Sequence, residues 1–176
     1  MAIKTILYIA MSQDGFISGE NNNLDFLNEY QVEGEDYGYA NFISSIDFIV
    51  VGRKTYEKVL AMGYPYHNKK KVFVITRNSK ESKNENLTFY NGNIKTLICQ
   101  LKDSTNKHIY CDGGAELASY MLKSNLIDKL TLSVIPLKLH KGTLLFENGL
   151  VPNTFELRKK EEYKSGLVQY CYELNI

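Results

Sequence analysis

Three short motifs carry glycine, basic or hydroxyl residues that suit phosphate binding, and each lies at the end of an apolar run. The motifs are Gly52-Arg53-Lys54-Thr55, Thr76-Arg77 and Asp112-Gly113-Gly114-Ala115-Glu116-Leu117. The apolar runs, which are typical of buried strands, are Phe48–Val51, Lys71–Thr76 and Lys107–Cys111. The first and third motifs open helical stretches, whose free N–H groups and partial positive charge attract anions.

The position of the motifs adds to this interpretation. Ligands of open α/β sheets lie beyond the carboxyl ends of the strands, and all three motifs lie at such ends. We therefore expect one dinucleotide to cross this edge of the sheet. Taken singly, the alternatives are a tight turn with two solvated basic residues, Arg53 and Lys54, and a plain turn at Gly113–Gly114. Neither glycine motif has the spacing of a Walker or Rossmann sequence.

The elements that must position these motifs alternate in type along most of the chain. Further strands and helices are predicted at Ile3–Met11, Tyr37–Ser45 (helix), Leu87–Tyr90, Asn93–Leu101 (helix), Ala115–Lys123 (helix) and Lys129–Ile135. Alternation predicts parallel βαβ units, and the last two strands, Phe155–Tyr163 and Leu167–Leu174, pair as a hairpin. We predict one α/β domain over residues 1–176: three layers, a mixed, mainly parallel central sheet, helices on both faces and a C-terminal antiparallel hairpin.

Composition excludes several classes of protein. The 176 residues include 21 Lys and Arg against 20 Asp and Glu, so the chain has no global charge for binding nucleic acid or a membrane surface. No apolar run is long enough to span a membrane, and no secretory signal is recognised. The three cysteines form no CxxC or Cys/His pattern, so we expect reduced thiols, no metal site and a cytoplasmic protein.

Taken together and in order, these motifs resemble the dihydrofolate reductase-like superfamily over nearly the whole chain. The sequence is most similar to stand-alone proteins that resemble the reductase (C-terminal) domain of bifunctional riboflavin biosynthesis enzymes. Ser12–Ile17 and Gly142–Phe146 add to the resemblance, the second as a distal turn that supports the loop after the first strand. The resemblance implies a homodimeric, NADPH-dependent reductase of a small pterin- or pyrimidine-like heterocycle, of the dihydrofolate reductase or 5-amino-6-(5-phosphoribosylamino)uracil reductase type.

The resemblance also implies where the cofactor binds. The nicotinamide carboxamide would meet the backbones of Ala10 and Ile17, and the adenosine ribose would lie at Thr76 and Arg77. An arginine there suits the 2′-phosphate of NADPH, and a cis peptide is expected between the paired glycines. The expected cofactor-binding residues are Ala10, Ile17, Gly52, Arg53, Lys54, Thr55, Thr76, Arg77, Gly113, Gly114, Ala115, Glu116 and Leu117.

Two carboxylates are candidates for the catalytic role in proton transfer. Asp36 has the spacing from Gly52 at which dihydrofolate reductases carry their pterin-binding carboxylate, but it could simply be a helix N-cap. Asp14 matches the Ser-x-Asp-Gly loop of the riboflavin-type branch, and it either binds substrate or caps a turn. The expected substrate-binding residues are Ser12, Phe26 and, on the floor of the pocket, Ser133.

Two other functions stay open. One is an NADPH-binding sensor or regulatory protein without turnover, because the chain lacks the first-loop Trp of dihydrofolate reductases. We expect Phe26 to take a comparable place. The other is a non-redox module that binds a nucleotide or phosphosugar; such a module would bind a phosphosugar tightly and NADPH not at all.

Overall fold

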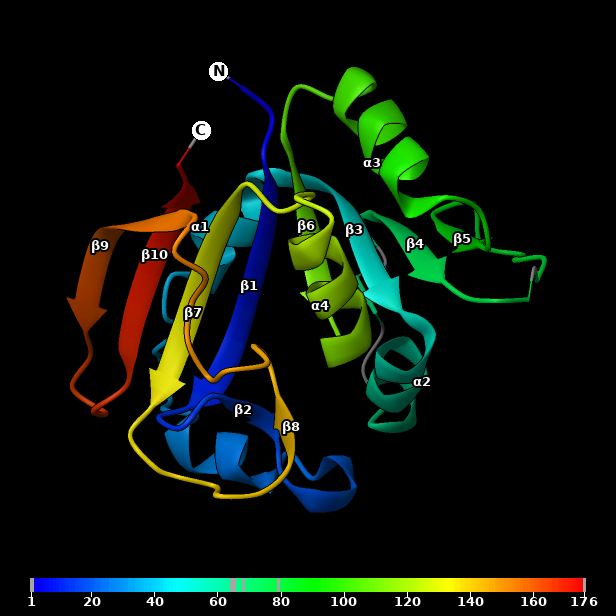
Figure 1. Ribbon diagram of the computed structural model, residues 1–176. Helices are drawn as coiled ribbons and strands as arrows, with labels where there is room; N and C mark the ends of the chain where they lie inside the picture. Colours follow the sequence, from blue (N-terminus) through cyan, green and yellow to red (C-terminus); the bar gives the residue numbers. More distant parts are fainter. Residues whose placement is uncertain (1, 64–65, 68, 79, 176) are drawn as a thin grey trace.

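The computed structural model describes residues 2–63, 66–67, 69–78 and 80–175, and its centre is an eight-stranded sheet (Figure 1). Across the sheet the strands lie in the order β5 (Leu87–Tyr90), β4 (Lys71–Ile75), β3 (Ile46–Gly52), β6 (His108–Gly113), β1 (Thr5–Ser12), β7 (Lys129–Ile135), β10 (Val168–Leu174) and β9 (Phe155–Glu162). The strands from β5 to β7 are parallel, whereas β10 and β9 are antiparallel to their neighbours.

Helices cover both faces of this sheet. One face packs against α3 (Ile94–Asp103) and α4 (Ala115–Lys123), and the other against α1 (Tyr39–Ser44) and α2 (Arg53–Ala61). Val50 and Val51 in β3 point to opposite faces, yet both are fully buried. Enclosure from both sides explains the continuous apolar run in β3 and confirms the predicted three-layer α/β fold.

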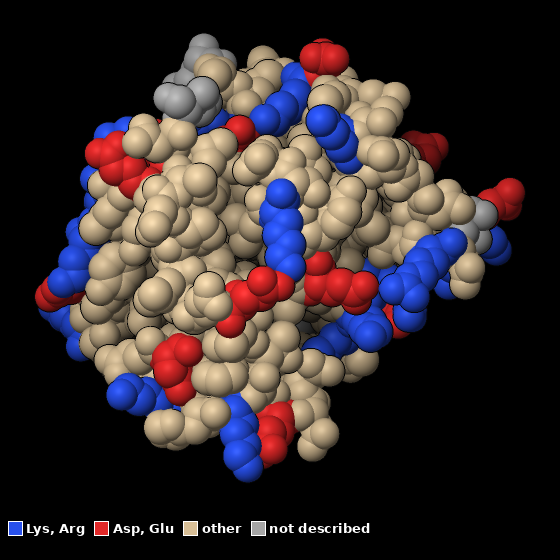
Figure 2. Space-filling model, viewed as in Figure 1, with Lys and Arg blue, Asp and Glu red and all other residues tan. Residues whose placement is uncertain are grey.

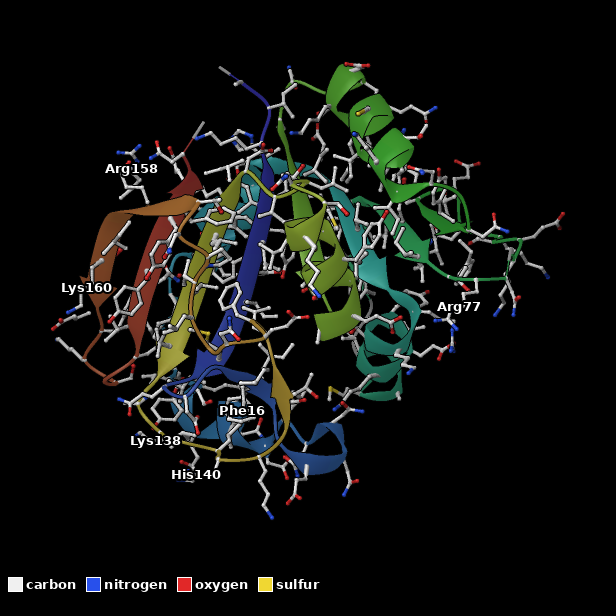
Figure 3. The ribbon with its side chains drawn as sticks, in the orientation of Figure 1. Phe16, Arg77, Lys138, His140, Arg158 and Lys160 are labelled. Carbon is white, nitrogen blue, oxygen red and sulfur yellow. The ribbon has the colours of Figure 1, made fainter. Side chains whose placement is uncertain are left out.

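The C-terminal hairpin is also confirmed, and its outer strand β9 carries charged side chains at the edge of the sheet. Arg158 and Lys160, labelled in Figure 3, form ion pairs along the strand with Glu156 and Glu162, at 2.9 Å and 2.5 Å. Charged side chains on an edge strand oppose pairing with another strand. The homodimer implied by the resemblance stays a prediction, and these charges disfavour direct pairing of two β9 strands.

A second, two-stranded sheet joins two loops at the carboxyl end of the large one. β2 (Phe16–Ser18) pairs antiparallel with β8 (Thr143–Leu144), and the N–H of Leu145 donates to the carbonyl of Gly15 at 3.0 Å. The pairing confirms that the distal Gly142–Phe146 motif supports the loop after β1. Two 3-10 helices, η1 (Glu20–Asn22) and η2 (Asp25–Tyr30), complete this loop.

Candidate cofactor and substrate site

The two glycine turns lie against each other at the carboxyl edge of the sheet. β3 and β6 are parallel neighbours, so Gly52 and Gly113 end adjacent strands. A β-carbon at Gly52 would lie 3.4 Å from the carbonyl oxygen of Gly113, and one at Gly114 only 2.8 Å from Oγ1 of Thr55. The Gly113–Gly114 peptide is cis, as the resemblance implies. Glycine keeps the two turns in contact, which brings both motifs to one place.

Helices α2 and α4 begin at this edge, directly after the two turns. Within the described residues, no side chain caps the N-terminus of either helix. The first N–H groups of α2 belong to Arg53, Lys54 and Thr55, while α4 begins with Ala115, Glu116 and Leu117. Uncapped N–H groups carry a partial positive charge. Two such helix ends side by side form a site suited to a pyrophosphate.

Basic side chains surround the same edge. Arg53 forms an ion pair with Glu57 at 2.7 Å, one helical turn along α2. Arg77 follows β4, the neighbour of β3, and projects into solvent (Figure 3). Over the face seen in Figure 2, acidic and basic side chains are interspersed around a wide uncharged area. Both arginines at these strand ends are paired with glutamates, Arg53 with Glu57 and Arg77 with Glu116.

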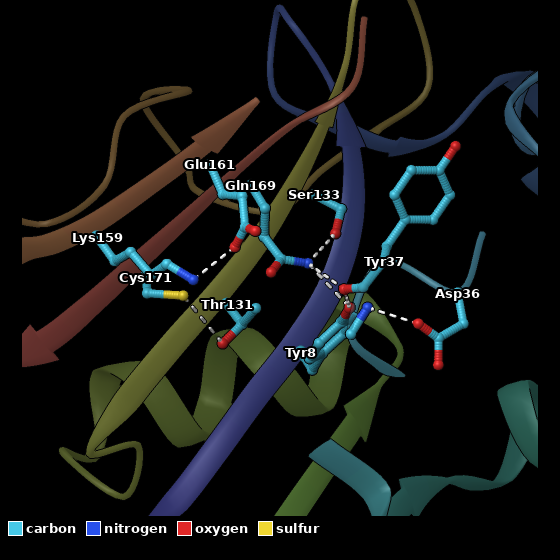
Figure 4. Close-up of polar contacts among 10 residues, drawn as sticks. Tyr8, Asp36, Tyr37, Thr131, Ser133, Lys159, Glu161, Gln169 and Cys171 are labelled. Carbon is cyan, nitrogen blue, oxygen red and sulfur yellow. Dashed lines mark hydrogen bonds and ion pairs between the residues drawn. The ribbon is translucent and has the colours of Figure 1, made fainter. Parts of the chain in front are cut away.

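The expected substrate side is built on β1, β7 and β10. Ala10 pairs in register with Ser133, and Ser133 with Gln169, so the three residues form one row across these strands. The Gln169 amide nitrogen donates to the Tyr8 hydroxyl at 2.9 Å and to the Ser133 hydroxyl at 3.2 Å (Figure 4). Tyr8 and Gln169 also donate to the carbonyl of Tyr37. Ser133 and Gln169 are buried and bonded to each other, to Tyr8 and to the carbonyl of Tyr37, so they form a fixed polar layer beneath this part of the sheet edge.

Asp36 lies next to this row and caps α1. Its carboxylate accepts hydrogen bonds from the N–H groups of Ala40 and Gly38, both at 2.9 Å. The hydrogen bond from Ala40 has the largest effect on the pKa of Asp36, and together with that from Gly38 it lowers this pKa. The N-cap residue of α1 is Gly38, so Asp36 is not the N-cap itself; its side chain caps the first turn from two positions earlier. Because the carboxylate is exposed to solvent, capping leaves a contact with a ligand possible.

Asp14 joins two loops instead of standing free in a pocket. It accepts hydrogen bonds from the Ser12 hydroxyl at 2.6 Å and from the N–H groups of His140 at 2.8 Å and Leu139 at 3.1 Å. The Ser12 hydroxyl in turn accepts from the N–H of Phe16. Figure 3 shows His140 and Phe16 close to these loops. Partial burial raises the pKa of Asp14, but the hydrogen bonds outweigh burial and lower the pKa to about 2.

We therefore expect Asp14 to contribute to stability in a pH-dependent way. Its pKa in the folded state lies below the unfolded value of 3.8, so its contribution is complete above about pH 4 and is lost as the pH falls toward 2. Solvent screening limits this contribution to roughly 1 kcal/mol. Urea unfolding at pH 7 and pH 2.5 measures it: Asp14→Asn is less stable than the wild type at pH 7, and the difference shrinks at pH 2.5. A difference that does not change with pH would contradict the assignment.

Phe26 and Leu117 are largely buried. Phe26 packs with Ile135 and Leu167 in a small cluster that also contacts Ala10, and Leu117 belongs to the main core. Ile17 in β2 packs against that core from the first loop.

An open pocket of about 590 Å³ adjoins this loop and is lined by Phe16, Gly19, Glu20, Asn21, Asn22, Lys141, Gly142 and Thr143.

Asp112 is a carboxyl group for which the sequence motifs predict no role. It lies at the end of β6, directly before the paired glycines, and accepts hydrogen bonds from the hydroxyls of Tyr66 and Tyr110. Burial raises the pKa of Asp112, whereas the two tyrosine bonds lower it. The signal in the sequence is an acidic residue at the end of an otherwise apolar strand. Its tyrosine partner at position 66, distant in sequence, cannot be predicted from local patterns.

Comparisons with known proteins point to one family. The model of the family described as "RibD C-terminal domain" matches residues 65–169. Two uncharacterized proteins of Bacillus subtilis (strain 168) are similar along nearly their whole length. YwjB is 38% identical over 168 residues, covering 94% of each chain. YyaP is 30% identical over 187 residues, covering 98% of this chain and 95% of its own.

Solved structures share the fold. A protein from Shewanella sp. PV-4, provisionally named for riboflavin biosynthesis, superimposes with a TM-score of 0.85 at 27% identity, covering 98% of this chain and 99% of its own. A Thermotoga maritima diaminohydroxyphosphoribosylaminopyrimidine deaminase/5-amino-6-(5-phosphoribosylamino)uracil reductase superimposes with a TM-score of 0.72 at 13% identity. The match covers 98% of this chain and 57% of that protein. Among the described residues, no helix is long and apolar enough to cross a membrane.

Proposed function

Because the chain belongs to the RibD C-terminal domain family, we propose that it is an NADPH-dependent reductase of a small pterin- or pyrimidine-like heterocycle. One observation carries the proposal: the turns at Gly52 and Gly113–Gly114 meet where α2 and α4 begin without side-chain caps. A dinucleotide pyrophosphate fits this arrangement. Arg77, two residues beyond β4, would bind the 2′-phosphate.

The residues present fit such a cofactor. A side chain in place of Gly114 would crowd Thr55 of the other turn, whereas glycine lets the two turns lie close together. Lys58 of α2 donates to the carbonyl of Asn22, which ties the first loop to the helix that would hold the pyrophosphate. This contact places Ile17 and Thr55 in connected segments, as one bound dinucleotide requires.

NADPH would supply a hydride from C4 of its nicotinamide ring. The role of the protein would be to hold the substrate ring against that carbon, near the row formed by Ala10, Ser133 and Gln169. Such positioning can supply a large share of the rate enhancement. Asp14 and Asp36 both have a lowered pKa and are ionised at neutral pH. Either would therefore act by orienting the water that delivers the proton.

Asp36 is the better placed of the two, because it is exposed and adjoins the polar row. We expect Asp36→Asn to lower kcat by about tenfold to a hundredfold and to change the NADPH Kd by less than about twofold. Asparagine retains one oxygen that can accept from Ala40, whereas the hydrogen bond from Gly38 to the second carboxylate oxygen is lost, so α1 keeps part of its cap. The measurement is NADPH oxidation with a panel of reducible pterins and pyrimidines, including the phosphoribosylated uracil.

Asp112→Asn is the matched comparison for this experiment. Of the three carboxyl groups Asp14, Asp36 and Asp112, Asp112 is the one whose pKa is raised. It is therefore the alternative proton donor. An unchanged kcat in Asp36→Asn together with a loss in Asp112→Asn would move the proton-transfer role from Asp36 to Asp112. Loss of NADPH binding in either variant would instead indicate a structural effect.

A sensor or regulator that binds NADPH without turnover is the second candidate function. It is favoured by the hydrogen bonds that Asp14 and Asp36 already accept from backbone N–H groups. This candidate predicts NADPH binding with no oxidation by any member of the panel. Tight binding of a phosphosugar without any binding of NADPH would instead indicate a non-redox module.

A further inference from the structure

Arg77 and Glu116 form an ion pair across the end of β3. Arg77 follows β4, and Glu116 lies in the first turn of α4, which follows β6; β3 lies between these two strands. Arg77 Nη2 and Glu116 Oε1 are 3.5 Å apart, and the side chains are 94% and 82% exposed. The two charges therefore stand on either side of the edge at which Gly52 ends β3.

Such a contact is easily exchanged for a ligand. It is long for an ion pair and almost fully hydrated, and exposed pairs of this kind contribute little to stability. A phosphate dianion carries more charge than a carboxylate and can accept two hydrogen bonds from arginine, which makes a stronger contact than the single one to Glu116. Arg77 can therefore leave Glu116 for an anionic group without an effect on the fold.

Glu116 has the opposite preference. A carboxylate repels a phosphate dianion, but it accepts a hydrogen bond from a sugar hydroxyl, as the acidic residue of NAD sites does with the ribose 2′-hydroxyl. With both residues at one place, the presence or absence of a 2′-phosphate decides which of them gains a ligand contact.

We propose that Arg77 and Glu116 together set the choice between NADPH and NADH, and that Glu116 keeps the preference for NADPH modest. The inference rests on the proposed function, because it assumes that a nicotinamide dinucleotide binds at this edge. Arg77 binds the 2′-phosphate of NADPH, while Glu116 opposes that phosphate and accepts the free 2′-hydroxyl of NADH.

The test is a fluorescence titration of NADPH and NADH with the wild type, Glu116→Gln and Arg77→Ala. We expect Glu116→Gln to tighten NADPH by about threefold to tenfold and to weaken NADH by about twofold to fivefold. Arg77→Ala weakens NADPH at least tenfold and leaves NADH within about twofold. Glu147→Gln is the matched control, because Glu147 is an exposed carboxylate paired with Lys123, in the last turn of α4.

The outcomes separate this inference from the proposed function. Equal shifts for both cofactors in Glu116→Gln would overturn the inference, because Glu116 would then act only through its charge. The same conclusion holds if Glu147→Gln gives the shifts of Glu116→Gln, or if Glu116→Gln changes neither Kd while the wild type binds NADPH. Failure of the wild type to bind either dinucleotide would refute the proposed function itself, and this inference with it.

Discussion

Gly142→Ala is expected to disrupt the pairing of β2 with β8 in the small sheet. Gly142 has a φ of +135°, and a β-carbon there would lie 1.9 Å from the carbonyl oxygen of Ser18. That oxygen belongs to the backbone of β2, so relief of the clash must move the strand. We expect the free energy of unfolding to fall by about 3 kcal/mol or more. NADPH affinity should fall at least about tenfold, because β2 carries Ile17.

Gly34→Ala provides the control for backbone conformation alone. Gly34 also has a positive φ, +79°, but no atom lies within 4 Å of its added β-carbon. The left-handed conformation by itself should cost about 1–2 kcal/mol, with no effect on NADPH. The measurements are urea unfolding and NADPH titration of both variants. The role given to β2 would be wrong if Gly142→Ala lost no more stability and no more affinity than Gly34→Ala.

Gly114→Ala is expected to disturb the contact between the two glycine turns. The added methyl group would lie 2.8 Å from Oγ1 of Thr55, in the first turn of α2. Either the Thr55 side chain must then rotate away, or the α2 N-terminus or the Gly114 turn must shift. Because the pyrophosphate would bridge the N-termini of α2 and α4, we expect NADPH affinity to fall by about tenfold to a hundredfold, equal to roughly 1.4–2.7 kcal/mol.

A double-mutant cycle with Thr55→Ala tests the cause. Thr55→Ala should weaken NADPH only about threefold by loss of the hydroxyl, and it removes the atom with which the new methyl group clashes. Gly114→Ala should therefore do much less harm in the Thr55→Ala background. The same loss of NADPH affinity in both backgrounds would show that the turns are not coupled through Thr55.

The sequence predicts the large sheet well because its strands carry strong local signals. The buried run of β3 and the helical spacing of the apolar positions in α3 are set by neighbouring residues. The sequence also predicts that the glycine motifs lie close together, since parallel strands end at the same edge of the sheet. The boundaries of β7 agree with the prediction, Lys129–Ile135.

Contacts between distant segments account for what the sequence patterns leave out. β2 and β8 have three and two residues, too few for a periodic signal, and pair only because the fold brings their loops together. Asp14 reaches His140, 126 positions away, so its pKa near 2 depends on tertiary structure. Asp112 likewise depends on Tyr66, which lies in a different segment. The roles of Asp14, Asp36, Ser12, Phe26 and Ser133 stay predictions.

The most direct test of the central claim is the change in backbone amide NMR signals when NADPH is added to the wild-type protein. The claim is that the α2 and α4 N-termini bind the dinucleotide at the edge where the glycine turns meet. We predict the largest shifts at residues 52–55 and 113–117, with smaller shifts at Arg77 and Ile17. An unchanged spectrum at saturating NADPH, or shifts confined to other parts of the molecule, would contradict the claim.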